Sequence, residues 1–242
     1  MNYFIISIFS FFLLALPAQS ASLRSQNGNE IEQLIETSLR KINESARREG
    51  LGMELVFQYG DVDRIARKLS GHFGRKTNPM LVEDNAVELL FYSLNPDGSK
   101  QHIGYFELNF EIGIARFLTH ETNITARYQN NSYYVFLKYM FINENYRGKK
   151  YSSKALMLLH DFLDLLRVDY TVLYIRSKMT YAGNLYIKSG YQFTANTITK
   201  IKDLALLKNI EENNAVQAFL QDSTQELHDG VATMIRHGGM YE

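Results

Sequence analysis

The chain has no cysteine, no tryptophan and no excess of either charge. The lack of cysteine excludes disulfide bonds, thiolate metal sites and a cysteine nucleophile, although it does not fix the cellular compartment. The 26 basic and 26 acidic side chains cancel. This balance argues against a strongly basic nucleic-acid binder and against an acidic, solvating protein.

Apolar and aromatic side chains are abundant instead. Of 242 residues, 45% are hydrophobic, and 16 tyrosines and 15 phenylalanines replace tryptophan as large packing units. This supply is enough for a packed core in one generous domain with additions. The six histidines show no metal-ligand spacing, and no nucleophile elbow of the GxSxG type occurs. We therefore expect no metal site.

An apolar run from Tyr3 to Leu16 opens the chain. It is shorter than the roughly 20 residues that span a bilayer, and it is typical of a secretory signal peptide. Small residues at Ala18 and Ser20 predict cleavage before Ala21. No Lys or Arg precedes the run, so an uncleaved apolar anchor or a buried segment stays open. With the signal peptide the protein is secreted or extracytoplasmic, with no stable membrane span after cleavage; without it, the protein is cytoplasmic.

The sequence divides into four parts. Residues 1–20 are the signal peptide or apolar segment, and residues 21–50 are a polar lead-in and a helix from Ile31. Residues 51–199 form the main domain, and residues 200–242 form a C-terminal helical extension.

Within the main domain, strands and helices are predicted from periodicity and turn residues. Asn95-Pro96-Asp97-Gly98 is the clearest turn, because proline presets φ and Asp-Gly tolerates a tight return. Strands are expected over 53–59, 86–94, 101–110, 132–142, 170–176 and 191–199, with a further short one at 114–118; helices are expected over 61–73, from 150 and over 180–190. An antiparallel hairpin followed by alternating strands and helices predicts an α/β (α+β) fold with helices on both faces of a mixed sheet.

A basic turn follows the strand that ends at Ile142 and precedes an amphipathic helix. The core-facing stripe of that helix comprises Ala155, Leu158, Leu159, Phe162 and Leu166. Unpaired amides and the helix dipole favour an anion at the helix start. Arg147, Lys149 and Lys150 lie there, where cations cost the helix a few tenths of a kcal/mol each. Their placement makes better sense if a phosphate occupies the turn, although basic residues also decorate ordinary exposed turns.

Two motifs and the hairpin carry a resemblance to a known superfamily. The first motif runs Ile142, Asn143, Glu144, Asn145, Tyr146, Arg147, Gly148, Lys149, Lys150, Tyr151, Ser152. The second comprises Met179, Ala182, Leu185, Tyr186, Gly190 and Tyr191. Together with the hairpin at residues 95–98, they resemble the GNAT N-acetyltransferase superfamily over residues 53–195. The resemblance implies a mixed, mostly antiparallel central sheet of about six or seven strands.

The resemblance also implies an acyl-CoA co-substrate, most simply acetyl-CoA. The amides of residues 147–152 would cradle its pyrophosphate, and the strand edge at Met140, Phe141 and Ile142 would pair with the pantetheine. Asn184 lies near the position of a family asparagine that holds this arm, but is displaced in register. Four positions depart from the family pattern: Glu144 replaces proline, Lys150 replaces glycine, Ser152 replaces glycine or alanine, and Met179 replaces asparagine. A lysine can still present its N–H if its φ stays negative.

The implied reaction is direct attack of an amine on the thioester. Tyr186 falls on the family's general-acid position, and a phenol can protonate a CoA thiolate. Glu107 and Glu144 are candidate bases, with surface or structural roles and a water chain as the alternatives. The acceptor amine, a small molecule or a protein, is not specified.

Two other interpretations remain open at this point. A catalytically degenerate GNAT-like binding protein, secreted as an effector, would explain the altered motif positions. A different acyl donor or acceptor on the same fold would also fit, including aminoacyl or long-chain acyl transfer.

Overall fold

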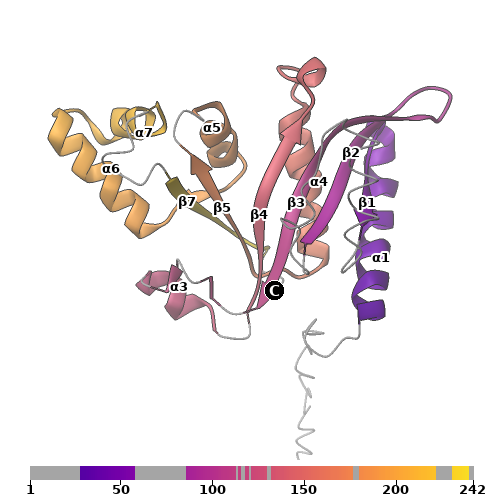
Figure 1. Ribbon diagram of the computed structural model, residues 1–242, viewed down its shortest axis with the longest axis horizontal. Coiled ribbons are helices and arrows are strands. Elements are labelled where there is room, and N and C mark those ends of the chain that lie inside the picture. The colour runs from indigo at the N-terminus through magenta and orange to yellow at the C-terminus, as the bar shows by residue number, and fades with distance from the viewer. Residues whose placement is uncertain are drawn as a thin grey trace, which may run out of the picture.

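The computed structural model describes residues 28–57, 86–112, 114–115, 118–119, 121–129, 132–176, 180–221 and 231–239. Its centre is a seven-stranded sheet with strand order β1-β2-β3-β4-β5-β7-β6 (Figure 1). The strands are β1 Leu51–Phe57, β2 Ala86–Leu94, β3 Lys100–Ile112, β4 Tyr133–Ile142, β5 Tyr170–Arg176, β6 Gln192–Phe193 and β7 Val231–His237. The helices are α1 Gly28–Ala46, α3 Thr122–Arg127, α4 Tyr151–Leu165, α5 Thr180–Lys188, α6 Ala195–Lys208 and α7 Glu212–Gln221, with 3-10 turns η2 Arg47–Glu49 and η5 Glu144–Tyr146.

Strand pairing is antiparallel throughout the sheet except between β4 and β5, which are parallel. The predicted class, a mixed and mostly antiparallel sheet with helices, is therefore confirmed. The hairpin between β2 and β3 is also confirmed: the Gly98 N–H donates to the Asn95 carbonyl at 2.9 Å, and Gly98 has φ +80°. Glycine reaches that φ without the steric cost of a Cβ atom.

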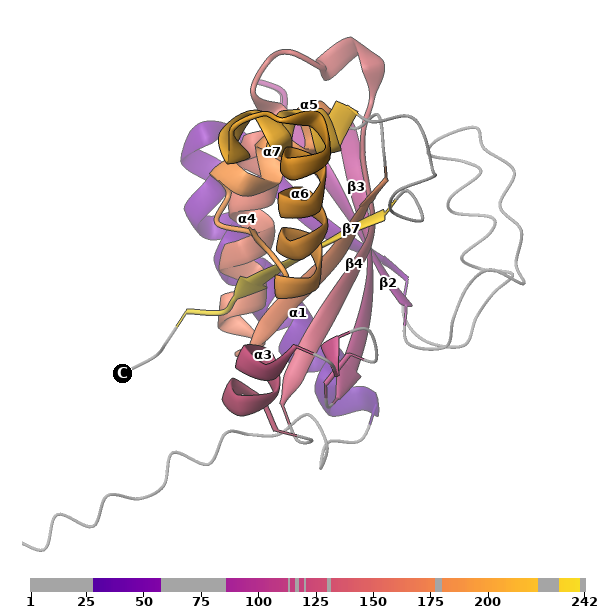
Figure 2. The same cartoon turned by 90° about the vertical axis from the view of Figure 1, so that its left-hand side faces the viewer.

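The sheet buries side chains on both faces. Because successive strand residues point to opposite faces, Leu173 belongs to one core and Val172 to another. The larger core lies under α1 and α4, which Figure 2 shows on the same side of the sheet. The smaller core brings α3 against the other face through Ile124 and Tyr128. All five residues of the predicted stripe on α4 are buried, as the 3.6-residue periodicity requires.

Helix α1 protects one edge of the sheet. The side-chain amide of Asn43 donates to the Met53 carbonyl at 2.7 Å, and its oxygen accepts from the Met53 N–H at 2.7 Å. Met53 lies on the edge strand β1, so Asn43 replaces a missing neighbouring strand at that residue. Satisfying an exposed edge in this way reduces unwanted pairing with another chain.

The C-terminal part of the chain differs from the prediction. Residues 200–208 and 212–221 are helical as expected, but Val231–His237 forms β7, which lies inside the sheet between β5 and β6. A purely helical C-terminal extension is therefore wrong. This strand is held by long-range pairing with β5, from Tyr170↔His237 to Arg176↔Val231, which local periodicity does not reveal.

The strand predicted over 191–199 is also mostly wrong, because β6 is only two residues long and α6 begins at Ala195. The Thr194 side chain caps this helix by accepting from the Thr197 N–H. The buried carboxylate of Glu121 accepts from the Ala195 N–H at 2.6 Å and the Asn196 N–H at 2.8 Å. The start of α6 is thus capped by Thr194 and by Glu121, which lies 74 residues before Ala195 in the chain. These caps favour a helix where the local sequence predicts a strand.

Several predictions fall outside the described residues. These are the apolar segment 1–20 and the helix over 61–73. Of the short strand at 114–118, the described residues 114–115 and 118 are in no strand. Among the helices that the structure describes, none is long and apolar enough to cross a membrane.

Candidate functional site

The parallel strands β4 and β5 separate part of the way along. They pair from Tyr134↔Tyr170 to Leu137↔Leu173 and no further, although β4 continues to Ile142 and β5 to Arg176. Figure 1 shows the two strands side by side at their starts and apart toward their ends. Among the strands that the structure describes, none pairs with this edge of β4 beyond Leu137.

Hydrogen bonding along β4 shows which backbone groups face this gap. The Asn143 N–H donates to the Ile103 carbonyl of β3 at 2.8 Å. Backbone groups alternate sides along a strand, so Ile142 and Met140 direct theirs away from β3, toward the side that β5 has left. The Ile142 carbonyl accepts from Arg147 Nε at 3.0 Å. The Ile142 and Met140 amides are thus the groups best placed for an extended ligand, whereas Phe141 faces β3.

A bulge in β4 lies beside the gap. The register with β3 shifts between Glu107↔Tyr139 and Leu108↔Leu137, and Lys138 and Tyr139 are both exposed. A bulge places two successive side chains on one face and redirects the backbone. Lys138 Nζ pairs with the Glu107 carboxylate at 3.0 Å. The candidate base Glu107 therefore lies at the bulge, half-buried and ion-paired, on the sheet face opposite the larger core.

The basic turn joins the end of β4 to α4. It contains η5, then Gly148 with φ +76° and Lys150 with φ +63°, and Lys150 is the N-cap of α4. The Arg147 N–H donates to the Glu144 carbonyl at 3.1 Å. Among the described residues, no group accepts a hydrogen bond from the amides of 148–153. Of the cradle predicted over residues 147–152, the Arg147 amide is therefore already bonded. The six amides of residues 148–153 remain for an anion.

Lys150 does not have the negative φ on which the sequence argument depended. Its backbone adopts the left-handed conformation instead, at a cost of about 1–2 kcal/mol for the Cβ atom. The Lys150 side chain is exposed. A strained lysine at this place is consistent with a cradle whose geometry matters more than its stability.

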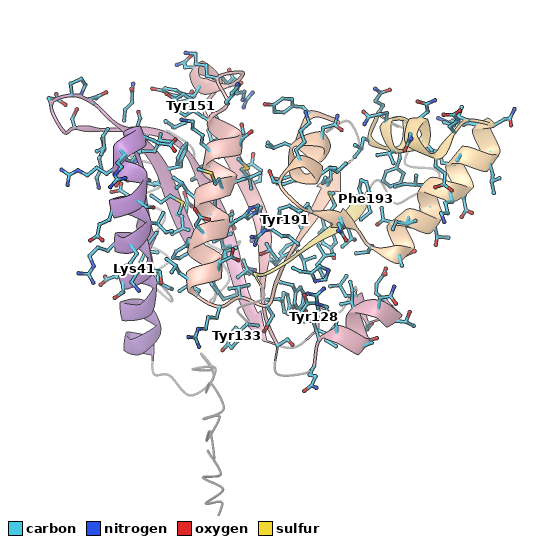
Figure 3. The ribbon with its side chains drawn as sticks, turned by 180° about the vertical axis from the view of Figure 1, so that it is seen from behind. Lys41, Tyr128, Tyr133, Tyr151, Tyr191 and Phe193 are labelled. Carbon is cyan, nitrogen blue, oxygen red and sulfur yellow. The ribbon has the colours of Figure 1, made fainter. Side chains whose placement is uncertain are left out.

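Aromatic packing fixes both ends of the turn. The Tyr146 and Tyr151 rings meet edge to face at 5.7 Å, and Tyr151 also contacts Phe91 of the core at 6.4 Å. Figure 3 labels Tyr151 at the start of α4. The amides between the two tyrosines are therefore held by side chains that point inward, which leaves the backbone exposed.

The cations of the turn divide into paired and unpaired groups. Arg147 Nη1 lies 3.3 Å from the Glu144 carboxylate, and Lys154 Nζ lies 2.9 Å from Glu49 of η2. Lys149 lies 5.9 Å from the centre of the Tyr146 ring. Within the described part of the chain, neither Lys149 nor Lys150 has an ion-pair partner. These two ammonium groups are available to an anionic ligand.

Tyr186 on α5 reaches the same gap from the side of the larger core. Its hydroxyl donates weakly to Met140 Sδ at 3.9 Å, and its ring packs against the larger core. Burial raises the pKa of the Tyr186 phenol to about 12. The phenol is therefore protonated at neutral pH, and the described residues offer its hydroxyl only the weak acceptor Met140 Sδ, which suits a proton donor.

Behind Tyr186 lies a second, fully buried tyrosine. The Tyr191 ring meets Tyr186 edge to face at 5.4 Å, and the Tyr191 hydroxyl lies 3.4 Å from His160 Nε2. Figure 3 shows Tyr191 between α4 and α5. Burial, with a smaller contribution from Arg236, lowers the pKa of His160 to about 3, so this imidazole is neutral. His160 supports the tyrosine pair from within the core.

Two other predicted residues have side-chain partners within the protein. Asn184 exchanges hydrogen bonds with the Gln217 side chain at 3.0 and 3.4 Å, which joins α5 to α7 and uses one of its N–H donors and its oxygen. Glu144 is highly exposed and paired with Arg147. Met179 lies outside the described residues.

The sequence did not predict the bulge at Lys138 and Tyr139. It also did not predict that pairing between β4 and β5 ends at Leu137 and Leu173. No residue type marks either feature, since both depend on the register between strands that are distant in sequence. Among the described residues, no group of three or more His, Asp or Glu side chains is arranged to hold a metal ion.

Comparison with known proteins gives similarity of fold. No protein-family profile and no curated protein matches the chain. Solved structures that match include Arabidopsis thaliana NAA60 in complex with acetyl-CoA (11% identity, 60% of this chain and 85% of that chain, TM-score 0.42). The NatC complex bound to Gag peptide and CoA matches at 10% identity over 77% of this chain and 98% of that chain, with a TM-score of 0.43.

A third match is a spermidine N-acetyltransferase SpeG chimera from Vibrio cholerae and hSSAT, with 13% identity over 78% of this chain and 96% of that chain and a TM-score of 0.41. These neighbours are GNAT acetyltransferases, the superfamily that the sequence motifs resemble. At such identities and scores, the matches carry no argument about what this chain binds or does. Function is therefore argued from the geometry of the chain.

Proposed function

We propose that the protein is an acyl-CoA-dependent N-acyltransferase, with acetyl-CoA as the simplest donor. The separation of β4 from β5 beyond Leu137 and Leu173 carries this proposal. The gap has unpaired strand edge along one side, a turn with unpaired amides at its open end, and a protonated tyrosine beside it. An extended ligand with an anionic end and a reactive group further along fits all three.

Binding follows from the order of these groups. The amides of Gly148 to Ser152 would accept the pyrophosphate, and the ammonium groups of Lys149 and Lys150 would add charge-assisted contacts. The pantetheine would lie along β4 and bond to the backbone of Ile142 and Met140, in the manner of an added strand. Arg147 would support the turn through the Ile142 carbonyl.

The chemistry is direct transfer. A neutral amine forms a bond to the thioester carbon, the C–S bond breaks, and the thiolate takes the proton of the Tyr186 hydroxyl. The Met140 N–H faces away from β3 and would donate to the developing oxyanion. Glu107, on the opposite face of the sheet at the bulge, would accept the proton that the amine loses. Acid and base would thus act from opposite faces.

One observation favours a second candidate. Lys150 occupies a left-handed position where the family pattern has glycine, so its Cβ adds bulk to the cradle. A GNAT-like binding protein without catalysis, which recognises another partner through this surface, would tolerate that bulk. Such a protein would not bind CoA.

Calorimetric titration of the full chain with CoA and acetyl-CoA separates the two candidates. We expect saturable binding that weakens at least about tenfold in the double variant Lys149→Glu/Lys150→Glu, because two charge-assisted phosphate contacts are reversed. Lys202→Glu, an exposed lysine of α6, is the matched control and should bind normally. Absence of binding by the folded, unsubstituted protein would reject the transferase and leave the binding protein.

Turnover tests the chemistry separately. Free thiol released from acetyl-CoA is followed with a panel of polyamines and peptides as acceptors. Tyr186→Phe should keep CoA affinity but lower the rate by about 100-fold, since it removes only the proton donor. Normal turnover in Tyr186→Phe would reject this tyrosine as the acid.

A further inference from the structure

The gap between β4 and β5 has a closed end as well as an open one. The open end meets the basic turn at Ile142, and the closed end is the Leu137↔Leu173 pair, where strand pairing resumes. This step rests on the proposed function: a cofactor whose pyrophosphate lies at the turn runs along β4 toward the closed end. Its acyl group, the most distant part, then points at Leu137 and Leu173.

The closed end is filled from both faces of the sheet. Leu137 and Leu173 are almost fully buried in the larger core. On the other face, the rings of Phe136 and Tyr174 meet edge to face at 5.1 Å across the same two strands. An acyl chain that reaches this point therefore meets packed side chains and a continuous backbone ladder, which it could enter only by separating the strands further.

Met140 lies beside Tyr186, between the turn and the closed end of the ladder. Its Sδ lies 3.9 Å from the Tyr186 hydroxyl, and its side chain packs against the larger core. If the hydroxyl protonates the thiolate, it must lie within about 3 Å of the sulfur. The thioester then lies in contact with the Met140 side chain, and the acyl group occupies the interval between Met140 and the Leu137–Leu173 pair.

We propose that Met140 is the residue that limits the length of the acyl chain that the site accepts. An acetyl group adds one methyl beyond the carbonyl and fits beside the methionine. A butyryl or hexanoyl chain must displace either the methionine or the strand pair. Methionine is flexible, so the limit is graded rather than absolute.

Competition calorimetry with CoA, acetyl-CoA, butyryl-CoA and hexanoyl-CoA tests this proposal without the natural acceptor. The unsubstituted protein should bind acetyl-CoA at least about tenfold more tightly than hexanoyl-CoA, a ratio that a few methylenes commonly produce in a hydrophobic pocket. Met140→Ala removes the end of the side chain and should reduce that ratio to about threefold or less. Met140→Leu, of similar volume, should keep it.

Met157→Ala is the matched control, because Met157 is an exposed methionine of α4. It should leave the ratio unchanged. If Met140→Ala fails to fold, Met140→Val shortens the side chain less and should also reduce the ratio of acetyl-CoA to hexanoyl-CoA affinity.

The outcomes distinguish two failures. No binding of CoA itself would reject the proposed function. Normal CoA binding with equal affinity for all chain lengths in the unsubstituted protein, or an unchanged acetyl preference in the folded Met140 variants, would overturn the role of Met140 while the transferase stands.

Discussion

Leu137 of β4 and Leu173 of β5 form the last pair of a parallel ladder, and beyond them the two strands share no register. This pair closes one end of the gap in which we place the cofactor. Beyond it β4 and β5 diverge, and the chain continues from them into α4 and α5. The turn, the strand edge and Tyr186 converge because the ladder ends there.

Lys150→Gly should stabilise the protein. Glycine removes the left-handed strain of φ +63°, which outweighs the added entropy of the unfolded chain, for a net gain of about 0.5–1 kcal/mol in the free energy of unfolding. Urea denaturation measures it. Lys149→Gly is the control, since Lys149 is not in the left-handed region, and it should not stabilise. A loss of stability in Lys150→Gly would show that the lysine side chain makes a contact worth more than the strain.

Tyr186 should remain an acid up to high pH. Its pKa is raised by burial to about 12, so the protonated form is favoured by the fold and its contribution to stability is lost only as pH rises from 10 through 12. The pH profile of single-turnover thiol release should show no fall between pH 8 and 10 that depends on Tyr186. A falling limb in that range that disappears in Tyr186→Phe would contradict the buried, neutral phenol.

His160 should make the protein sensitive to acid. Its folded pKa is lowered to about 3 from 6.5, so the unfolded chain binds the proton first and stability falls as pH drops from 6.5 toward 3. When the pH falls from 7.5 to 4.5, this imidazole should lower the free energy of unfolding by about 2–3 kcal/mol. Urea denaturation of His160→Gln at both pH values should show a smaller loss than the unsubstituted protein, and an equal loss would refute the buried neutral imidazole.

Glu121 should stabilise α6 from a distance. Its carboxylate accepts two backbone hydrogen bonds at the helix start, and it is only 4% exposed. Glu121→Gln keeps the shape but loses the charge and places an N–H₂ group beside backbone donors, so the free energy of unfolding should fall by about 1–3 kcal/mol. Glu212→Gln, at an exposed residue of α7, controls for charge and should change little.

Local pattern predicted the parts of the fold that local chemistry determines. The turn at residues 95–98 follows from its proline and glycine, and the stripe on α4 follows from helical periodicity. The strand ending at Ile142 and the turn after it were also predicted correctly in position. Each of these depends on residues within a few positions of one another.

The missed features depend on partners far away in the chain. β7 lies inside the sheet because it pairs with β5, and α6 replaces a predicted strand because Glu121 caps it. Asn184 was predicted to hold the pantetheine arm, and the Gln217 side chain of α7 donates a hydrogen bond to its oxygen. The gap begins where β4 and β5 stop pairing, and no residue type in either strand predicts that point.

The most direct measurement is a CoA titration of the full, isotope-labelled chain, followed by amide NMR. The account predicts saturable shifts at the amides of Met140 and Ile142 and at those of Gly148 to Ser153. It also predicts no shifts at Asn43 and Met53, which border a separate groove of about 520 Å³ between α1 and β1. Saturable shifts confined to that groove, or no shifts at all in the folded protein, would contradict the placement of CoA between β4 and β5.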